Sequence, residues 1–341
     1  MANKANARPI LMAALILAFA FGLGLFSTEQ FVRARGIDYL EHAQQITNYE
    51  AILAGHAGNP WQYRVFSAFV MNVVLTLASH VNVPHHVAYS LIALRVILDT
   101  LILLLSVVYY RKLRLSLPHA LIGMAVLAWG MSYSYYNSDL SFNTFFDVFF
   151  YLLAGIFILR EGFIWIVPIT LLAAFNRETS GFIPFMLLFY AIFVLPKDSP
   201  RRRDAYLIFA AAAAVYALVF VGLRLAYGPQ ELLVSHGHYP GLPLLTFNLS
   251  QKLTWEQLMA TLSIIPILAL LGYPKWPASL RVFFWVVVPL WFGIHAAAAV
   301  MAETRLFLVP QALVLIPGAL FFAEQAAPKV EAPARAAGGE T

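Results

Sequence analysis

Long apolar runs separated by short polar turns dominate this sequence. They lie near 9–27, 88–110, 117–134, 144–159, 163–176, 181–196, 204–226, 257–273, 282–302 and 306–323. A helix crosses the hydrocarbon core of a bilayer with about 20 apolar residues. The composition agrees, because 61% of the residues are hydrophobic and 11% are charged, whereas soluble domains carry roughly 25% charged residues. We therefore expect an all-α, polytopic membrane protein with about ten transmembrane helices.

An eleventh apolar run, roughly 65–79, is assigned by the distribution of basic residues. Counting it as a span would put Arg111, Lys112 and Arg114 outside the cell and invert everything downstream. If it does not span, the cytoplasmic side collects 14 of the 22 basic residues: Lys4, Arg8, Arg111, Lys112, Arg114, Arg160, Lys197, Arg201, Arg202, Arg203, Lys275, Arg281, Lys329 and Arg335. Cytoplasmic loops are enriched in Lys and Arg. This favours ten spans with both termini cytoplasmic, and a re-entrant or interfacial helix at 65–79 on the outer face.

The expected organisation is one transmembrane domain over residues 1–325, with long outer-face loops at 28–64 and 227–256. The apolar stretch that begins at Pro9 is too long for the core of a cleavable signal and lacks a small-residue cleavage site. We expect it to remain as the first helix. The tail 326–341 is rich in Ala, Pro, Gly and Glu and is expected to be a disordered cytoplasmic segment.

Composition also excludes several classes of function. The absence of cysteine rules out disulfides, thiolate metal sites and thiol catalysis. The net charge is +5, but the basic residues form short clusters between apolar runs, so no nucleic-acid partner is expected. The cytoplasmic segments are short and contain no phosphate-cradling glycine loop, so no nucleotide or redox cofactor is expected.

The first outer segment has the pattern of a helix that lies in the plane of the membrane interface. Apolar residues recur at threes at Ile37, Leu40, Ala43, Ile46, Tyr49 and Ile52. Polar residues form a second stripe at Asp38, Glu41, Gln45 and Asn48. Such two-sided helices rest on the bilayer with the apolar stripe down. Asp38 and Glu41 then share one face, as a reactive pair or as an ordinary solvated face.

Two polar turns interrupt the apolar runs on the outer side. The turn 176–181 lies between runs of 13 and 14 apolar residues, each only about 20 Å long as a helix. Its Arg177 and Glu178 are therefore expected below the membrane surface, where they line a wet cavity or form an ion pair that staples two helices. A second turn, Glu303–Arg305, faces the same side, so two arginine forks able to grip a phosphate share one face.

Other polar residues have a structural and a functional interpretation. Arg95 and Asp99 are one helical turn apart and are expected to neutralise each other inside the membrane. Asp139 and Asp147 border the outer ends of their helices, as loop caps or as cavity residues. His236 and His238 are two residues apart, a spacing at which both could bind one metal ion. Because no acidic or histidine cluster lies nearby in the sequence, they are expected to be solvated loop residues.

The order of these features resembles the GT-C superfamily of membrane glycosyltransferases, which use sugars carried on polyprenyl or dolichyl phosphate. The resemblance covers the first two-thirds of the chain and rests on loose motifs: Gly36–Leu40, Ala54–Gly55, Tyr63–Arg64, Tyr110–Arg114, Ser134–Tyr136 and Asn176–Thr179. Many members carry paired acidic residues where this chain has Asp38 followed by Tyr39. A divalent metal is therefore not supported, and no cofactor is expected.

The resemblance implies transfer of a sugar from a polyprenyl-phosphate carrier to a glycan, lipid or protein acceptor at the extracytoplasmic face of a bacterial inner membrane. It implies an inverting reaction with Asp38 as base and Glu41 as the competing candidate. The donor phosphate would be held by Arg177, Arg305 and Arg64. Supporting roles would fall to Glu178, Glu303, Asp139, His236 and His238. A lipid-linked glycan flippase or transporter is the alternative, and an assembly subunit without chemistry is a third class.

Overall fold

The structure, a computed structural model, describes residues 4–326 apart from 42–43, 81–83, 137–141 and 233. The described residues are helical and contain no strand. The elements are α1 Lys4–Arg35, α2 Ile37–Glu41, α3 Gln44–Ala54, η1 Trp61–Tyr63, α4 Val65–Ala78, α5 His86–Lys112, α6 Leu117–Tyr133, α7 Phe142–Leu159, η2 Phe163–Trp165, α8 Ile166–Asn176, η3 Glu178–Gly181, α9 Phe182–Phe193, α10 Pro200–Tyr227, α11 Leu242–Ser250, α12 Lys252–Leu262, α13 Ile265–Gly272, η4 Tyr273–Lys275, α14 Ala278–Ala298, η5 Thr304–Phe307, α15 Leu308–Pro310, η6 Gln311–Leu315 and α16 Ile316–Ala326.

Six described helices are long and apolar enough to cross a membrane: Pro9–Arg35, His86–Lys112, Phe142–Leu159, Pro200–Tyr227, Ala278–Ala298 and Thr304–Glu324. This makes the chain a multi-pass membrane protein. The pair α12–α13 adds a seventh if it counts as one span, although it bends by 61°. The ten predicted spans all coincide with helices, but α6, α8 and α9 are shorter than the length test requires, so the number ten is not confirmed.

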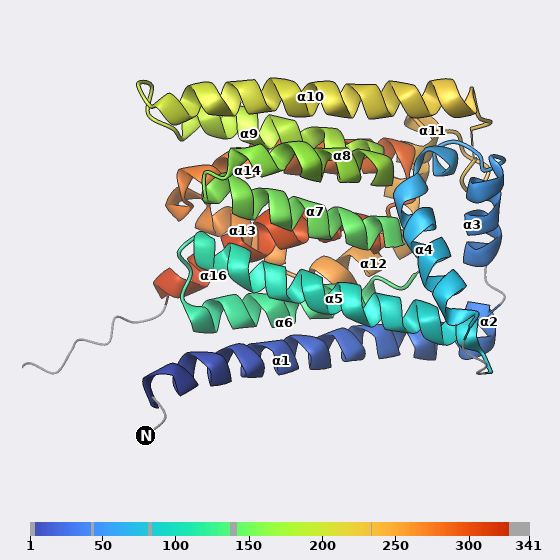
Figure 1. The fold of residues 1–341 in the computed structure, drawn as a ribbon, viewed down its shortest axis with the longest axis horizontal. Coiled ribbons are helices and arrows are strands. Elements are labelled where there is room, and N and C mark those ends of the chain that lie inside the picture. The colour runs from blue at the N-terminus through green and yellow to red at the C-terminus, as the bar shows by residue number, and fades with distance from the viewer. Residues whose placement is uncertain (1–3, 42–43, 81–83, 137–141, 233, 327–341) are drawn as a thin grey trace, which may run out of the picture.

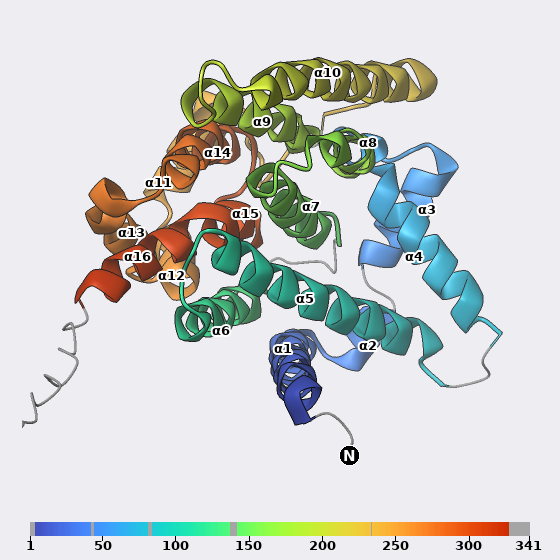
Figure 2. The ribbon, with the colours of Figure 1, turned by 60° about the vertical axis from the view of Figure 1, so that its left-hand side comes forward.

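The long helices run side by side along one direction of the bundle (Figure 1). Helix α7 lies between α5 and α8 and is mostly buried (Figure 2). Its neighbours cover it on several sides because aromatic and apolar residues occur all round it, as expected for a helix without a solvent-facing side. By contrast, α1 and α10 are largely exposed and form two outer surfaces of the bundle.

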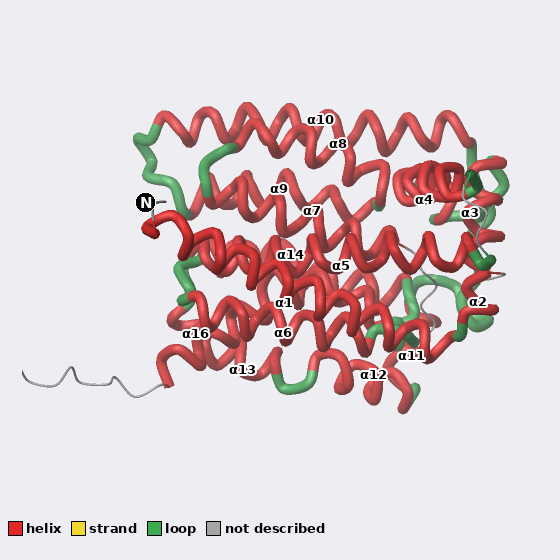
Figure 3. The backbone as a smooth tube through the Cα atoms, turned by 60° about the horizontal axis from the view of Figure 1, so that its bottom comes forward, coloured by secondary structure: helices red, strands yellow, loops and turns green. Residues whose placement is uncertain are grey.

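One end of the bundle carries helices that lie across the long direction. Helices α3 and α4 cross it in Figure 1, and the same end gathers much of the loop in Figure 3. We call this the crosswise end. Helix α4 has 14 residues, which is about 20 Å of helix and shorter than a span. The run 65–79 thus forms a short crosswise helix, and its assignment as a non-spanning segment stays a prediction, since α6, α8 and α9 are also shorter than the length test requires.

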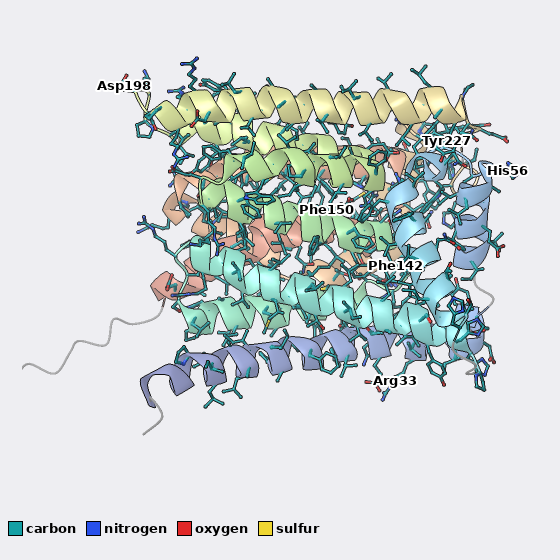
Figure 4. The ribbon with its side chains drawn as sticks, viewed as in Figure 1. Arg33, His56, Phe142, Phe150, Asp198 and Tyr227 are labelled. Atoms are coloured by element: carbon teal, nitrogen blue, oxygen red, sulfur yellow. The ribbon has the colours of Figure 1, made fainter. Side chains whose placement is uncertain are left out.

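The opposite end, which we call the basic end, contains the last turn of α5 and the connection from α9 to α10. Figure 4 shows Asp198 at this end, whereas His56, Phe142 and Tyr227 lie at the crosswise end. Arg111 and Lys112 finish α5 there, and Arg201 begins α10. The expected disordered tail lies outside the described residues from 327 onward.

The predicted interfacial helix over 37–52 is helical on both sides of residues 42–43. Helix α2 ends at Glu41 and α3 begins at Gln44, and the predicted stripe residue Ala43 lies outside the described residues. Leu40 is fully buried against the bundle and Ile52 is buried beside Ala57 and Ala68, so the apolar stripe contacts protein. The periodicity could not distinguish a lipid surface from a protein surface, because both select the same residues.

Polar groups inside the bundle are tied across helices. The hydroxyls of Tyr109 and Tyr110 donate to the carbonyls of Leu313 and Ala312 at 2.9 and 3.0 Å, in the π-helical turn η6. Arg95 and Asp99 lie 3.7 Å apart and are both buried, as the sequence suggested. These contacts hold α5 firmly and thereby support α7, which carries part of the site.

Candidate functional site

A cavity of about 720 Å³ opens at the crosswise end, and arginines from three separate segments line it. Arg64 joins η1 to α4, Arg177 follows α8, and Arg305 lies in η5. The remaining wall consists of Tyr39, Asn48, Asn59, Pro60, Trp61, Asn143, Thr144, Leu232, Val234, Ser235, Pro240, Ala298, Ala299, Val300, Glu303 and Leu306. The cavity therefore combines three arginines and one carboxylate, Glu303, with neutral polar and aromatic groups.

Arg177 is the most elaborately held of the three arginines. Helix α8 ends at Asn176, and the extended backbone at Arg177 turns its side chain away from the helix axis. Its Nη1 lies 3.3 Å from Oδ2 of Asp147 on α7, and its Nη2 lies 3.2 Å from Nε2 of His295 on α14. The side chain is only about 4% exposed, and its Nε–H has no hydrogen-bond partner among the described residues.

The hydrogen bonds of His295 determine which of its ring nitrogens carries the proton. Its Nδ1 lies 2.8 Å from the carbonyl oxygen of Trp291, and a carbonyl oxygen can only accept. The proton is therefore on Nδ1, which leaves Nε2 as an acceptor for Arg177. His295 is a neutral, buried residue that fixes the direction of the guanidinium.

The turn after α8 is anchored from both sides. Asn176 donates to Asp147 at 2.8 Å, the hydroxyl of Tyr151 donates to the Thr179 carbonyl at 2.6 Å, and the hydroxyl of Tyr216 donates to the Glu178 carbonyl at 2.7 Å. A side chain at Gly181 would come within 2.8 Å of the Tyr216 ring, so only glycine allows this close packing. These contacts fix the backbone of the turn, whereas Oδ1 of Asn176, Nε of Arg177 and Oε1 of Glu178 are buried without a hydrogen-bond partner among the described residues.

Arg64 and Glu178 form the second ion pair of the cavity wall. Nε and Nη2 of Arg64 each lie 3.1 Å from the same carboxylate oxygen. Burial raises the pKa of Glu178, but the Arg64 and Arg177 guanidiniums and a backbone hydrogen bond outweigh it, so the pKa lies below its usual range. Burial and the Arg64 charge lower the pKa of Arg177 to about 10, with Asp147 opposing them. Glu178 is therefore ionised at neutral pH.

Arg305 is paired within its own turn. Its Nη2 donates to Oε2 of Glu303 at 2.8 Å, and both side chains are largely buried while lining the cavity. The hydroxyl of Thr304, between them, is hydrogen-bonded to Thr261 at 2.6 Å. The Glu303–Arg305 turn is thus fixed to α12, and each cavity arginine has a carboxylate partner within 3.3 Å.

The neutral wall of the cavity is held by the segment before α4. The amide of Asn59 donates to the Glu231 carbonyl at 2.8 Å, and the hydroxyl of Tyr63 donates to the Gly228 carbonyl at 2.8 Å. The Trp61 ring lies beneath the Arg64 guanidinium, 5.3 Å from its carbon. These contacts join two loops that are far apart in sequence and close one side of the cavity.

The other predicted site residues lie away from this wall or outside the described chain. Asp38 is exposed on α2, and its neighbour Tyr39 lines the cavity. Glu41 accepts a hydrogen bond from the Ala88 amide at 3.1 Å, at the first turn of α5. Asp139 lies outside the described residues.

The two loop histidines contact an aromatic side chain. The His236 and His238 rings lie 5.6 and 4.7 Å from the ring of Phe247 on α11. Across the described ranges, no group of three His, Asp or Glu side chains comes together as a metal cluster. The two histidines therefore help to hold their loop against α11.

Two sequence interpretations of Arg177 and its neighbours need correction. The hypothetical Arg177–Glu178 staple is not the observed pairing, because Arg177 binds Asp147 and Glu178 binds Arg64. Asp147, considered as a loop cap or a cavity residue, is instead the buried anchor behind Arg177. His295 was not foreseen. The only hint in the sequence was a single polar residue in the second half of the apolar run 282–302, which leads to the Glu303–Arg305 turn.

Comparisons of the chain with family models, with curated proteins and with solved structures find no match. The case for a function therefore rests on the chemistry of the cavity.

Proposed function

We propose that the chain transfers a glycosyl group from a polyprenyl-phosphate carrier to an acceptor hydroxyl at this cavity. The observation that carries the proposal is the meeting of Arg64, Arg177 and Arg305 at one cavity, from three segments of the sequence. Guanidinium groups bind phosphate oxygens through two parallel N–H donors. Ionisable side chains that face a cavity in a membrane protein mark candidate substrate sites.

The charge balance of the cluster favours a phosphate with little negative charge. Arg64, Arg177 and Arg305 are offset by Glu178, Asp147 and Glu303, so the six groups sum to zero. A sugar-phosphate diester carries one negative charge, which such a cluster accepts without a metal. Glu303 in the cavity wall, together with Asp147 and Glu178 behind the arginines, disfavours the larger charge of a diphosphate through like-charge repulsion.

The neutral wall suits a sugar beside that phosphate. Asn59 and Asn143 offer amide donors and acceptors for hydroxyls, and Trp61 offers a flat apolar surface on which the C–H face of a sugar ring packs. Ligand sites typically combine apolar walls with a few polar groups that fix orientation. The cavity volume of about 720 Å³ admits both the sugar and an acceptor group.

In the proposed step, an acceptor oxygen attacks the anomeric carbon from the side opposite the phosphate. A new glycosidic bond forms, the bond between the anomeric carbon and the phosphate oxygen breaks, and polyprenyl phosphate leaves with the electron pair. The hydroxyl proton passes to a carboxylate, for which Asp38 is the proposed base. The arginines stabilise the charge that grows on the leaving phosphate.

Glu303 is the second candidate for the base, because its carboxylate itself lines the cavity. However, its carboxylate is already engaged by Arg305 at 2.8 Å. Asp38 is open to solvent beside the wall residue Tyr39, and an acceptor would approach from that side. We therefore retain Asp38 as the base and Glu303 as the partner of Arg305.

The proposed orientation puts the crosswise end outside the cytoplasm in a bacterial inner membrane, with ten spans. The positive-inside bias supports it, because Arg111, Lys112 and Arg201 lie at the basic end. A lipid-linked glycan flippase or transporter is the rival function. The concentration of the arginine cluster at one end, instead of at the middle of the bundle, favours an enzyme over a transport path.

The decisive experiment incubates the purified protein with polyprenyl-phosphate-linked mannose or glucose and a mixed pool of glycan and lipid acceptors. Release of polyprenyl phosphate that depends on the protein and on an acceptor supports the proposal. Movement of intact lipid-linked sugar across a vesicle membrane, without release, would instead assign a flippase. A requirement for a nucleotide-sugar with no lipid carrier would contradict the proposal.

A further inference from the structure

A second hollow of about 610 Å³ lies on the side of the bundle, between α9 and α14. Phenylalanines at positions 182, 185, 189 and 193 share one face of α9 and form one wall. Ala278, Val282 and Trp285 share one face of α14 and form much of the other. Residues three and four apart lie on one face of a helix, so both walls run along the helix axes as an apolar groove.

The groove has a charged group at only one end. Arg281 lies in the first turn of α14, toward the basic end, and is the only charged residue among those that line the groove. Its Nη2 donates to the Pro274 carbonyl at 2.7 Å, while its buried Nε has no hydrogen-bond partner. Among the described residues no carboxylate forms an ion pair with Arg281, whereas Arg201 at the same end is paired with Glu161.

The length of the groove matches one leaflet of a bilayer. From Phe182 to Phe193 the α9 axis advances by about 16 Å, and half of the hydrocarbon core measures about 15 Å. The aromatic cluster of Tyr273, Trp276 and Trp285 borders the charged end. Tyr and Trp are enriched at the level of lipid headgroups. The groove thus begins at headgroup level and is about as long as one leaflet is thick.

We propose that this groove binds an anionic glycerophospholipid of the leaflet at the basic end. The phosphate would contact Arg281, and one acyl chain would lie along the phenylalanine wall of α9. Charge complementarity, leaflet length and the absence of polar groups along the groove all favour this occupant. The proposal is independent of the glycosyl-transfer proposal, because the groove and the cavity are separate and the test below measures binding alone.

The test uses quenching of Trp285 by brominated acyl chains. The protein is reconstituted in dioleoylphosphatidylcholine vesicles that contain brominated phosphatidylglycerol or brominated phosphatidylcholine. The chain has 7 tryptophans, so the signal of Trp285 is the difference between the protein and its Trp285→Phe variant. We expect Trp285 to be quenched at about fivefold lower content of the anionic lipid than of the neutral one, the preference expected for one arginine near the surface.

Two variants and one control make the result specific. Arg281→Gln should abolish the preference for phosphatidylglycerol, and Val286→Phe should reduce quenching by both lipids by filling the groove. Arg201→Gln removes another arginine of the basic end and should leave the preference intact. Equal quenching by both lipids, or an unchanged preference in Arg281→Gln, would overturn the proposal. The proposal would also be overturned if undecaprenyl phosphate displaced the brominated lipid in a way that does not depend on Arg281. Cross-linking of two copies of the chain through Trp285→Cys would overturn it as well.

Discussion

The Nε2 atom of His295 lies 3.2 Å from Nη2 of Arg177, joining residues 118 positions apart in sequence. His295 is held in turn by its bond to the Trp291 carbonyl, and its ring is stacked on the Trp291 ring at 5.0 Å. Arg177 is thus oriented from α14 as well as from α7. The guanidinium, which lines the cavity, cannot rotate without losing a hydrogen bond.

We predict that His295→Phe lowers the rate of glycosyl transfer by about 10–100-fold. Without His295, the guanidinium of Arg177 is no longer held in the direction that aligns the donor phosphate. The Michaelis constant for the donor should rise, since the phosphate is held before and during transfer. His295→Gln should recover part of the loss, because an amide oxygen can accept from Arg177. Steady-state kinetics at several donor concentrations measure both effects. Equal activity of His295→Phe and the natural protein would remove His295 from the site.

We predict that Arg177→Lys reduces transfer by about 10²–10³-fold, although it keeps the positive charge. An ammonium group cannot bind Asp147, His295 and a phosphate in the directions that the planar guanidinium offers. The same substitution at Arg305 should also lower donor binding. The control is Arg33→Lys, an exposed arginine paired with Glu29 on α1, which should keep full activity. Full activity of Arg177→Lys would support a purely structural role for the arginine.

The sequence predicted the helical membrane class because apolar runs reflect the solvent directly. It also indicated the turns that carry Arg177 and Arg305, because charges between short apolar runs are costly without a partner or a cavity. The number of spans could not be fixed in this way. Helices such as α8 and α9 are too short by length alone, and the bend between α12 and α13 has no clear periodic signal.

The partners of the arginines were beyond the sequence for a different reason. Arg177 pairs with Asp147 and Arg64 pairs with Glu178, over separations of 30 and 114 residues. Adjacent charges such as Arg177 and Glu178 suggest a local pair, but neighbours in a turn point in different directions. Only the packing of α7 and α4 against α8 selects the observed partners.

We predict that Glu178→Gln destabilises the protein by about 2 kcal/mol at pH 7. This is below the 3–5 kcal/mol of fully buried pairs, because the Arg64 and Glu178 side chains are 12% and 24% exposed. The folded pKa of Glu178 lies below its unfolded value of about 4.3. The stability that ionised Glu178 gives to the folded protein is therefore fully present above the unfolded pKa. It is lost as the pH falls through the folded pKa.

Thermal unfolding of the purified protein in detergent tests this sign. The melting temperatures of the natural protein and of Glu178→Gln should differ fully at pH 7 and at pH 5, and should converge below about pH 4. The exposed pair Lys252–Glu256 gives the control, since Glu256→Gln should change the melting temperature little at any pH. If the difference in melting temperature between the natural protein and Glu178→Gln grew on acidification, the pairing of Glu178 with Arg64 would be contradicted.

We predict that the two ends of the bundle face opposite sides of the membrane. The chain has no cysteine, so a single introduced cysteine reports its own side without background. His56→Cys at the crosswise end should react with an impermeant maleimide added to intact cells, and Lys112→Cys at the basic end should react only after permeabilisation. Both positions are exposed. Labelling of position 112 in intact cells would reverse the orientation and, with it, the side of the cavity.

The final prediction concerns the base. Asp38→Asn keeps the shape of the side chain but removes its basicity, and it should lower the transfer rate by about 10²–10⁴-fold with little change in donor affinity. Asp38 is exposed on α2 beside the cavity-wall residue Tyr39, so the substitution disturbs no buried contact. Glu41→Gln provides the comparison on the same helix.

Because Glu41 accepts from the first turn of α5, its loss should cost stability near 1 kcal/mol and leave the rate largely unchanged. Glu303→Gln should raise the Michaelis constant for the donor, since it releases Arg305 from its partner. The three variants separate the roles when rate and donor affinity are measured together. If Glu303→Gln abolishes transfer at saturating donor while Asp38→Asn retains it, the carboxylate inside the cavity is the base, and Asp38 is a solvated residue of α2.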